Sequence, residues 1–195
     1  MPEVVATSRL VAVVPNLLSI LRIGLAVIFP FTPAAWPGVR VAVVVAGGAS
    51  DWIDGQIARR YAATTTLGGL LDAFADKLFV FMVIATLTWE GQLQLWQAAM
   101  VLARDFAVAF VAAYAAVQQD WPTFRQMRPR PLGKVTTFAQ FALILIALIW
   151  PVLVPIAIAG TIGVSVLATG DYLVQFTRVL KERPQRRVEA PSKSR

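Results

Sequence analysis

An all-helical integral membrane protein with six transmembrane helices is the fold that this 195-residue sequence predicts. Hydrophobic residues make up 57% of the chain and charged residues only 15%, with a mean hydropathy of +0.66. Soluble domains contain about 45–50% apolar residues, and about a quarter of their residues are charged. The apolar residues also gather in six segments, each near the length of about 20 residues that a helix needs to cross a bilayer.

Each of the six segments reads as a helix because its apolar runs lack the strict alternation of a membrane β-strand. The predicted spans are about Pro15–Phe31, Val39–Tyr61, Leu67–Trp89, Leu93–Val117, Gly133–Trp150 and Val154–Leu180. Residues Met1–Val14 are expected to form a short interfacial helix. Residues 1–182 would therefore form one membrane domain, and the polar residues 183–195 a disordered, basic cytoplasmic tail.

The basic residues are distributed very unequally between the predicted loops. The chain has 18 Lys and Arg and a net charge of +7. With six spans, 14 of these residues fall on one side of the membrane, while Arg40 alone falls on the other. The positive-inside rule then places both termini in the cytoplasm. We expect the membrane to be a bacterial inner or plasma membrane. This distribution favours contact with anionic lipid headgroups over nucleic-acid binding.

The few acidic residues are concentrated inside two spans. The chain has no Cys and no His, so acid–base or metal chemistry falls to its 11 carboxylates. Four of them are Asp51, Asp54, Asp72 and Asp76. Each aspartate at the centre of a membrane helix costs about 2.5–3.5 kcal/mol on insertion scales. Such a cluster calls for compensating positive charge.

The spacing of the four aspartates predicts a cation site. Asp51 and Asp54 lie about 60° apart on one helix face, and Asp72 and Asp76 about 40° apart on another. Spans two and three are antiparallel, so the two pairs are expected to face each other near the cytoplasmic side. Carboxylate ligands suit Mg²⁺ or Mn²⁺, and four of them can hold one or two ions.

Around the aspartates the sequence resembles the signature of the CDP-alcohol phosphatidyltransferase family. The matching residues are Asp51-x-x-Asp54-Gly55-x-x-Ala58-Arg59, eight further residues, and Gly68-x-x-x-Asp72-x-x-x-Asp76. The resemblance covers roughly residues 10–180. Further segments are similar to the phosphatidylglycerophosphate synthase branch: residues 15–22, 75–77, 103–105, 133–137 with Gln140, and 169–172.

The resemblance implies transfer of a phosphatidyl group from CDP-diacylglycerol to an alcohol, with release of CMP. It assigns the four aspartates to metal binding, with two ions, and Asp76 also to proton abstraction from the acceptor hydroxyl. The residues it places beside the cytidine diphosphate are Asp51, Gly55, Ala58, Arg59, Gly68, Asp72, Asn16 and Arg22. The small residues have an alternative role in helix packing, and Asn16 and Arg22 have alternatives in helix capping and snorkelling.

Basic residues later in the chain are candidates for binding a phosphorylated acceptor. We favour Arg104 and Lys134, with Arg130 as a further contact. The alternatives are an internal Arg104–Asp105 ion pair and, for the loop arginines, retention on the positive side of the membrane. The expected acceptor is sn-glycerol 3-phosphate, followed by inositol phosphate and by phosphatidylglycerol, which would give cardiolipin.

The sequence departs from the family pattern at two places, and the second of them leaves the acceptor open. Residue 73 is Ala where many relatives have Pro, and the segment Gln118–Pro131 is longer and more basic than the glycerophosphate branch suggests. The family resemblance also implies a homodimer. Outside this class, a cation transporter that uses the four acids, or a non-catalytic membrane scaffold, would be the rival functions.

Overall fold

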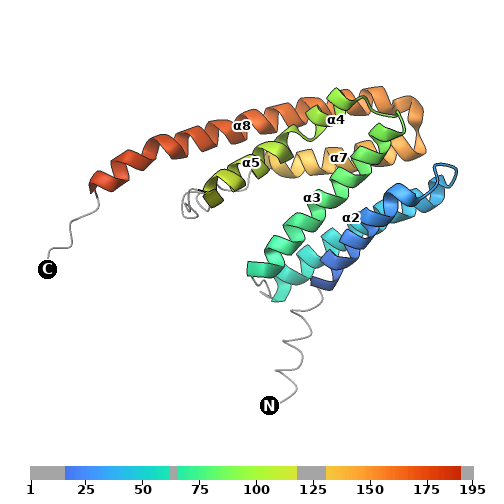
Figure 1. Cartoon of the computed structure of the whole chain (residues 1–195), viewed down its shortest axis with the longest axis horizontal. Helices are drawn as coiled ribbons and strands as arrows, with labels where there is room; N and C mark the ends of the chain where they lie inside the picture. Colours follow the sequence, from blue (N-terminus) through green and yellow to red (C-terminus); the bar gives the residue numbers. More distant parts are fainter. Residues whose placement is uncertain (1–15, 62–65, 118–130, 190–195) are drawn as a thin grey trace, which may run out of the picture.

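The structure of the protein is a computed structural model that describes residues 16–61, 66–117 and 131–189. All regular elements in these ranges are helices (Figure 1). Residues 16–28 are helical, and the later elements are η1 (Phe29–Phe31), α2 (Pro37–Tyr61), α3 (Thr66–Trp89), α4 (Leu95–Val101), α5 (Ala103–Val117), α7 (Pro131–Ile149), η2 (Pro151–Leu153) and α8 (Val154–Glu189).

All six predicted segments are occupied by helix, which confirms the all-helical fold class over the described residues. Two boundaries differ from expectation. The fourth segment is broken into α4 and α5, which are bent by 60° relative to each other. Helix α8 continues to Glu189, so residues 183–189 extend a helix where a disordered tail was expected. Arg, Glu and Gln in this stretch are good helix formers, and extending an existing helix requires no new nucleation, although Pro184 within it opposes the helix. The expected interfacial helix lies outside the described residues.

Membrane-spanning character is clearest at the C-terminal end of the fold. By length and composition, Pro131–Ile149 and Pro151–Arg178 qualify as spans, and the bent pair α4–α5 adds a third if it is counted as one span. Helices α2 and α3 have 25 and 24 residues. They are long enough to cross a bilayer, but they carry the charged residues of the predicted site. The six expected spans are therefore supported only in part.

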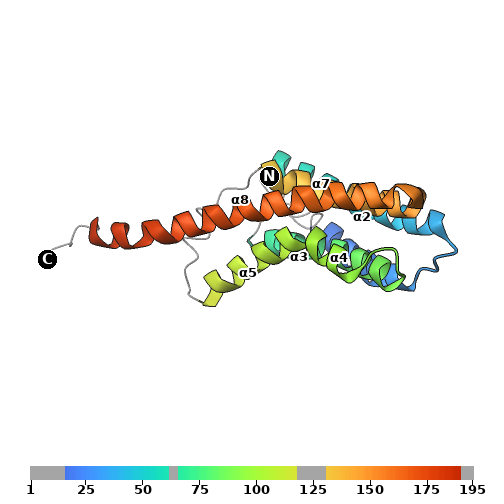
Figure 2. The same ribbon diagram turned by 90° about the horizontal axis from the view of Figure 1, so that it is seen from above.

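The helices pack around a core that draws its residues from α3, α4 and α7, with contributions from residues 26–29, α2 and the start of α8. Helix α8 runs along α4, α5 and α7, while α2 contacts α3 and α7 (Figures 1 and 2). Phe79 of α3 is fully buried, and its ring stacks on that of Phe141 of α7, with ring centroids 6.2 Å apart. Gly47 of α2 lies against the Phe79 ring. This aromatic contact joins α2, α3 and α7.

An ion pair between a buried arginine and an exposed glutamate joins α2 to the end of α3. The Arg40 guanidinium donates to both carboxylate oxygens of Glu90, with Nη1 2.7 Å from Oε2. It also donates to the Thr32 carbonyl and lies over the Phe29 ring. Arg40, which the loop count treats as a free outer charge, is only 2% exposed. It is therefore part of the packing between these helices.

Candidate functional site

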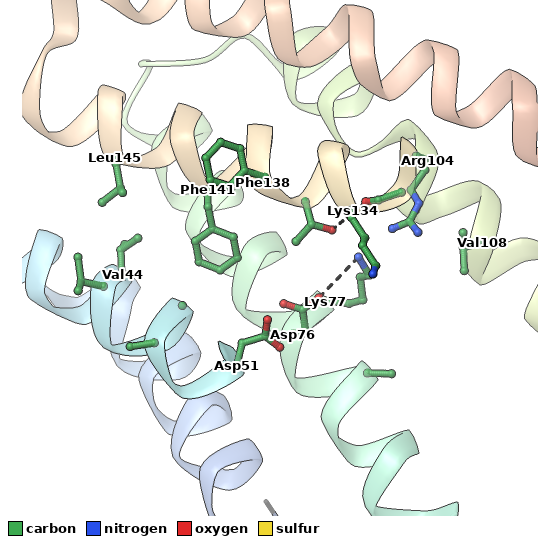
Figure 3. Close-up of a pocket in the computed structure, with 16 residues that line it drawn as sticks. Val44, Asp51, Asp76, Lys77, Arg104, Val108, Lys134, Phe138, Phe141 and Leu145 are labelled. Carbon is green, nitrogen blue, oxygen red and sulfur yellow. Dashed lines mark hydrogen bonds and ion pairs between the residues drawn. The ribbon is translucent and has the colours of Figure 1, made fainter. Parts of the chain in front are cut away.

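A cavity of about 860 Å³ lies between α2, α3, α5 and α7. Its charged lining residues gather in one part of the cavity, and its larger apolar residues gather in another (Figure 3). The charged residues are Asp51, Asp76, Lys77, Arg104 and Lys134. The apolar part includes Val44, Phe138, Phe141 and Leu145. A ligand that fits such a cavity would combine anionic groups with an apolar portion.

One buried arginine links the two aspartate-bearing helices. Nη1 of Arg22 lies 3.2 Å from Asp51 Oδ1 and 3.0 Å from Asp72 Oδ1. The Arg22 side chain has no exposed surface, and its Nε donates to Ser50 Oγ at 3.3 Å. This burial excludes the snorkelling alternative for Arg22. It also confirms that the two helices bring Asp51 and Asp72 together.

Asp76 is the most buried of the three described motif aspartates. Its side chain is 16% exposed, compared with 42% for Asp51 and 41% for Asp72. Asp76 Oδ2 lies 3.7 Å from Lys77 Nζ, whereas Oδ1 is buried and has no hydrogen-bond partner among the described residues. A buried carboxylate oxygen without a partner is costly. It is suited to accept a proton or to bind a cation.

The carboxylate of Asp105, which is largely buried, connects two of the three basic residues that line the cavity. Its Oδ1 lies 2.6 Å from Lys77 Nζ and 3.2 Å from Arg104 Nη1. Its Oδ2 accepts a hydrogen bond of 2.7 Å from Gln140 Nε2. The Arg104–Asp105 ion pair considered from the sequence is therefore present. Arg104 nevertheless lines the cavity together with Lys134, so the pairing does not remove it from the site.

The described side chains do not by themselves form a metal-binding group. Among them, no three acidic residues lie close enough together to hold an ion. Asp54 is not included, because the structure describes its backbone in α2 but not its side chain. The unpartnered Asp76 oxygen and the neighbouring Asp51 carboxylate are nevertheless the ligand types that Mg²⁺ and Mn²⁺ prefer. These two carboxylates are therefore of the chemical type that would hold a divalent cation.

The other predicted site residues divide into described and undescribed groups. Asn16 and Gly68 lie in the helix of residues 16–28 and in α3, and both are partly buried. Gly55, Ala58 and Arg59 belong to α2, but the structure describes only the course of the helix at these positions. Arg130 lies outside the described residues.

Several polar residues in the site were not singled out from the sequence. Ser19 and Ser50 contact Asp72 and Arg22, and Ser165 of α8 is fully buried at the α4–α5 break. Each is a lone hydroxyl in an apolar helix. That signal is ambiguous, because serine in membrane helices commonly bonds to the backbone of its own preceding turn.

The fold and the site define a helical protein with apolar, membrane-type helices and a cavity in which acidic and basic groups meet. The chain belongs to the CDP-alcohol phosphatidyltransferase family, whose sequence profile matches residues 12–169. The expected family resemblance is thereby confirmed.

Relatives of known name that resemble this chain bear two kinds of name. A protein of Mycobacterium tuberculosis H37Rv, provisionally named a cardiolipin synthase, is 37% identical over 109 residues, which are 55% of this chain and 52% of that protein. A CMP-forming cardiolipin synthase of Streptomyces coelicolor is 33% identical over 141 residues, 69% of this chain and 63% of its own. A CDP-diacylglycerol–glycerol-3-phosphate 3-phosphatidyltransferase of Pectobacterium atrosepticum is 31% identical over 168 residues, 79% of this chain and 84% of its own. The chain thus spans about half the length of the mycobacterial relative.

Proposed function

We propose that this protein transfers the phosphatidyl group of CDP-diacylglycerol to an alcohol and releases CMP. The proposal rests on one carboxylate oxygen of Asp76. This oxygen is buried in α3 without a hydrogen-bond partner among the described residues, and Asp76 lines the charged cavity. Family membership and relatives with transferase names support the same reaction. The cavity's apolar part suits a donor whose acyl chains stay in the bilayer.

In the proposed reaction the acceptor hydroxyl attacks the β-phosphorus of the donor. A new P–O bond forms, the bond to the bridging oxygen breaks, and CMP leaves with that oxygen. Asp76 takes the proton of the acceptor hydroxyl. Asp51, Asp54, Asp72 and Asp76 would hold Mg²⁺ or Mn²⁺, which would neutralise the diphosphate charge and stabilise the leaving group. Gly55, Ala58, Arg59 and Gly68 are proposed to lie beside the cytidine diphosphate.

Glycerol 3-phosphate is the proposed acceptor. Lys77, Arg104 and Lys134 supply three cations to one cavity, which suits a phosphate monoester that carries up to two negative charges. The names of the Streptomyces and mycobacterial relatives favour phosphatidylglycerol as a second candidate, with cardiolipin as product. Inositol phosphate would bind to the same cations, so it is tested alongside the other two acceptors.

We further propose that all six helical segments cross a bacterial inner membrane, with both termini and the cavity on the cytoplasmic side. The unequal distribution of Lys and Arg supports this orientation. A homodimer is proposed on the family resemblance alone. Cross-linking of the protein in membranes, together with labelling of single cysteines introduced into each loop, tests both statements.

The reaction is tested with purified protein in lipid nanodiscs, with CDP-diacylglycerol, Mg²⁺ and each acceptor in turn. We expect CMP and a new phospholipid in equal amounts, fastest with glycerol 3-phosphate, and loss of both in Asp76→Asn. Absence of CMP with every acceptor would overturn the proposal. In that case Mg²⁺ uptake into vesicles that Asp54→Ala abolishes would favour a cation transporter, and a function that survives replacement of all four aspartates would favour a scaffold.

A further inference from the structure

The break between α4 and α5 has no cause in its own sequence. Sharp helix bends are almost always found at Pro, at Gly or Ser pairs, at π-bulges, or where a side chain enters the backbone hydrogen-bond ladder. The residues at the break are Val101, Leu102 and Ala103, and none of these types breaks a helix. The cause must therefore lie in what packs against them.

Two side chains from other helices bond to the backbone at the break. The Val101 carbonyl accepts hydrogen bonds from Gln140 Nε2 of α7 and from Ser165 Oγ of α8, each at 3.0 Å. In a continuous helix this carbonyl would serve the N–H of Asp105. Ser165 Oγ also accepts a hydrogen bond of 3.4 Å from the backbone N–H of Arg104. Both side chains are fully buried, so water does not compete with these bonds.

The same two side chains control the residues that follow the break. Arg104 is held at its backbone by Ser165 and lines the cavity with its side chain. Asp105, which is held at Oδ2 by Gln140, presents Oδ1 to Lys77. The Gln140 amide nitrogen serves two acceptors, while its Oε1 is buried without a partner among the described residues. Burying this unpartnered oxygen is unfavourable. The two hydrogen bonds that Gln140 Nε2 donates, to the Val101 carbonyl and to Asp105, explain why the side chain is placed there.

We infer that Gln140 and Ser165 are positioning residues, which hold the α4–α5 break open so that Arg104 reaches the cavity and Asp105 reaches Lys77. Neither residue lines the cavity, so neither is assigned contact with a substrate. The consequence for catalysis rests on the proposed function, whereas the consequence for helix geometry does not.

A distance measurement tests the geometry independently of activity. The chain has no cysteine, so Leu95→Cys and Ala113→Cys, both at exposed positions, provide two unique sites for spin labels. A straight helix would separate these Cα atoms by about 27 Å, and a bent one by several Å less. Double electron–electron resonance in nanodiscs should give the shorter distance in the otherwise unchanged protein. In Ser165→Ala combined with Gln140→Leu the distance should lengthen or spread.

Thr161→Val is the matched control. Thr161 lies one turn before Ser165 in α8, is 3% exposed, and bonds to the Ala139 carbonyl of α7 and not to the break. The control should leave the distance unchanged. An unchanged distance in the combined variant would overturn the inference. If the combined variant does not fold, Ser165→Ala alone decides in the same way, because it removes a single oxygen atom.

Kinetics test the consequence for the cavity. In Ser165→Ala we expect the KM for glycerol 3-phosphate to rise about tenfold while the KM for CDP-diacylglycerol stays unchanged, with Thr161→Val altering neither. Equal changes in both KM values, or none, would refute a positioning role toward Arg104. If the unchanged protein releases no CMP with any acceptor, the proposed function fails, and the spin-label distance still decides whether these residues hold the break.

Discussion

Lys77 Nζ lies 2.6 Å from Asp105 Oδ1, and this ion pair joins the end of the aspartate motif on α3 to the first turn of α5. Asp105 is only 11% exposed and also receives Arg104 and Gln140. Lys77 is 37% exposed and reaches back toward Asp76. One carboxylate thus sets the positions of two cations that line the cavity.

Removing this carboxylate should destabilise the protein and disorganise the cavity. In Asp105→Asn, Lys77 and Arg104 would lose their shared counter-charge. A double-mutant cycle with Lys77→Gln should give a coupling energy of about 1–2 kcal/mol. This value is smaller than for a fully buried ion pair, because Lys77 is partly exposed. Denaturant unfolding in detergent provides the measurement. Strictly additive effects would mean that the ion pair contributes nothing.

The pairing of α2 with α3 at the aspartates could be predicted from the sequence. Consecutive antiparallel helices with acids at i, i+3 and i, i+4 bring Asp51 and Asp72 together, and they share Arg22 in the structure. The partner of Arg22 could not be predicted. An arginine in an apolar helix has the same local pattern whether it snorkels to the interface or pairs with buried acids.

The α4–α5 break could not be predicted for a different reason. Its local sequence is compatible with a continuous helix, which is why one span was expected over residues 93–117. The residues that hold the break lie 39 and 64 positions further along the chain. Hydrophobic periodicity reports local conformation, so it carries no information about side chains that reach a backbone carbonyl from other helices.

Divalent cations should stabilise the folded protein through the aspartates. If Mg²⁺ binds only the native state, its addition at about 100 times Kd stabilises the fold by about 2.7 kcal/mol. We expect a rise in Tm with Mg²⁺ that is largely lost in Asp76→Asn and retained in Asp105→Asn. Thermal scans with Mg²⁺ and with a chelator provide the comparison, and the same rise in all three proteins would contradict metal binding at Asp76.

The Arg40–Glu90 ion pair should matter for stability and not for the reaction. Arg40 precedes Asp51 by 11 residues on α2, which corresponds to about 16 Å along the helix. Arg40→Ala removes a buried guanidinium that donates to Glu90 and to the Thr32 carbonyl, and the loss of these charge-assisted hydrogen bonds should cost about 1–3 kcal/mol. Denaturant unfolding should detect this loss, while the rate of CMP release per folded molecule should stay within twofold of the unchanged protein.

Gly47 should tolerate no side chain, because a Cβ there would lie 2.5 Å from Phe79 Cζ. The Phe79 ring is fully buried and stacked on Phe141, so it has little room to move away. Gly47→Ala should therefore destabilise the fold by about 1–3 kcal/mol. Gly24→Ala is the control, because it is helical and a Cβ there meets nothing within 4 Å. The control should be neutral or slightly stabilising in the same unfolding measurement, and equal losses in both variants would disprove the packing argument.

A side chain at Gly133 should impair binding of the acceptor and leave the stability of the fold nearly unchanged. A Cβ at this position would lie 2.6 Å from Arg104 Nη2, which is the far end of a flexible side chain. Gly133→Ala should therefore displace the guanidinium within the cavity. The free energy of unfolding should stay within about 1 kcal/mol of the unchanged protein, since Ala has a higher helix propensity than Gly. Because Arg104 is proposed to bind the acceptor phosphate, the KM for glycerol 3-phosphate should rise several-fold, and the KM for CDP-diacylglycerol should not. An unchanged acceptor KM, with the fold intact, would show that the position of Arg104 is irrelevant to acceptor binding.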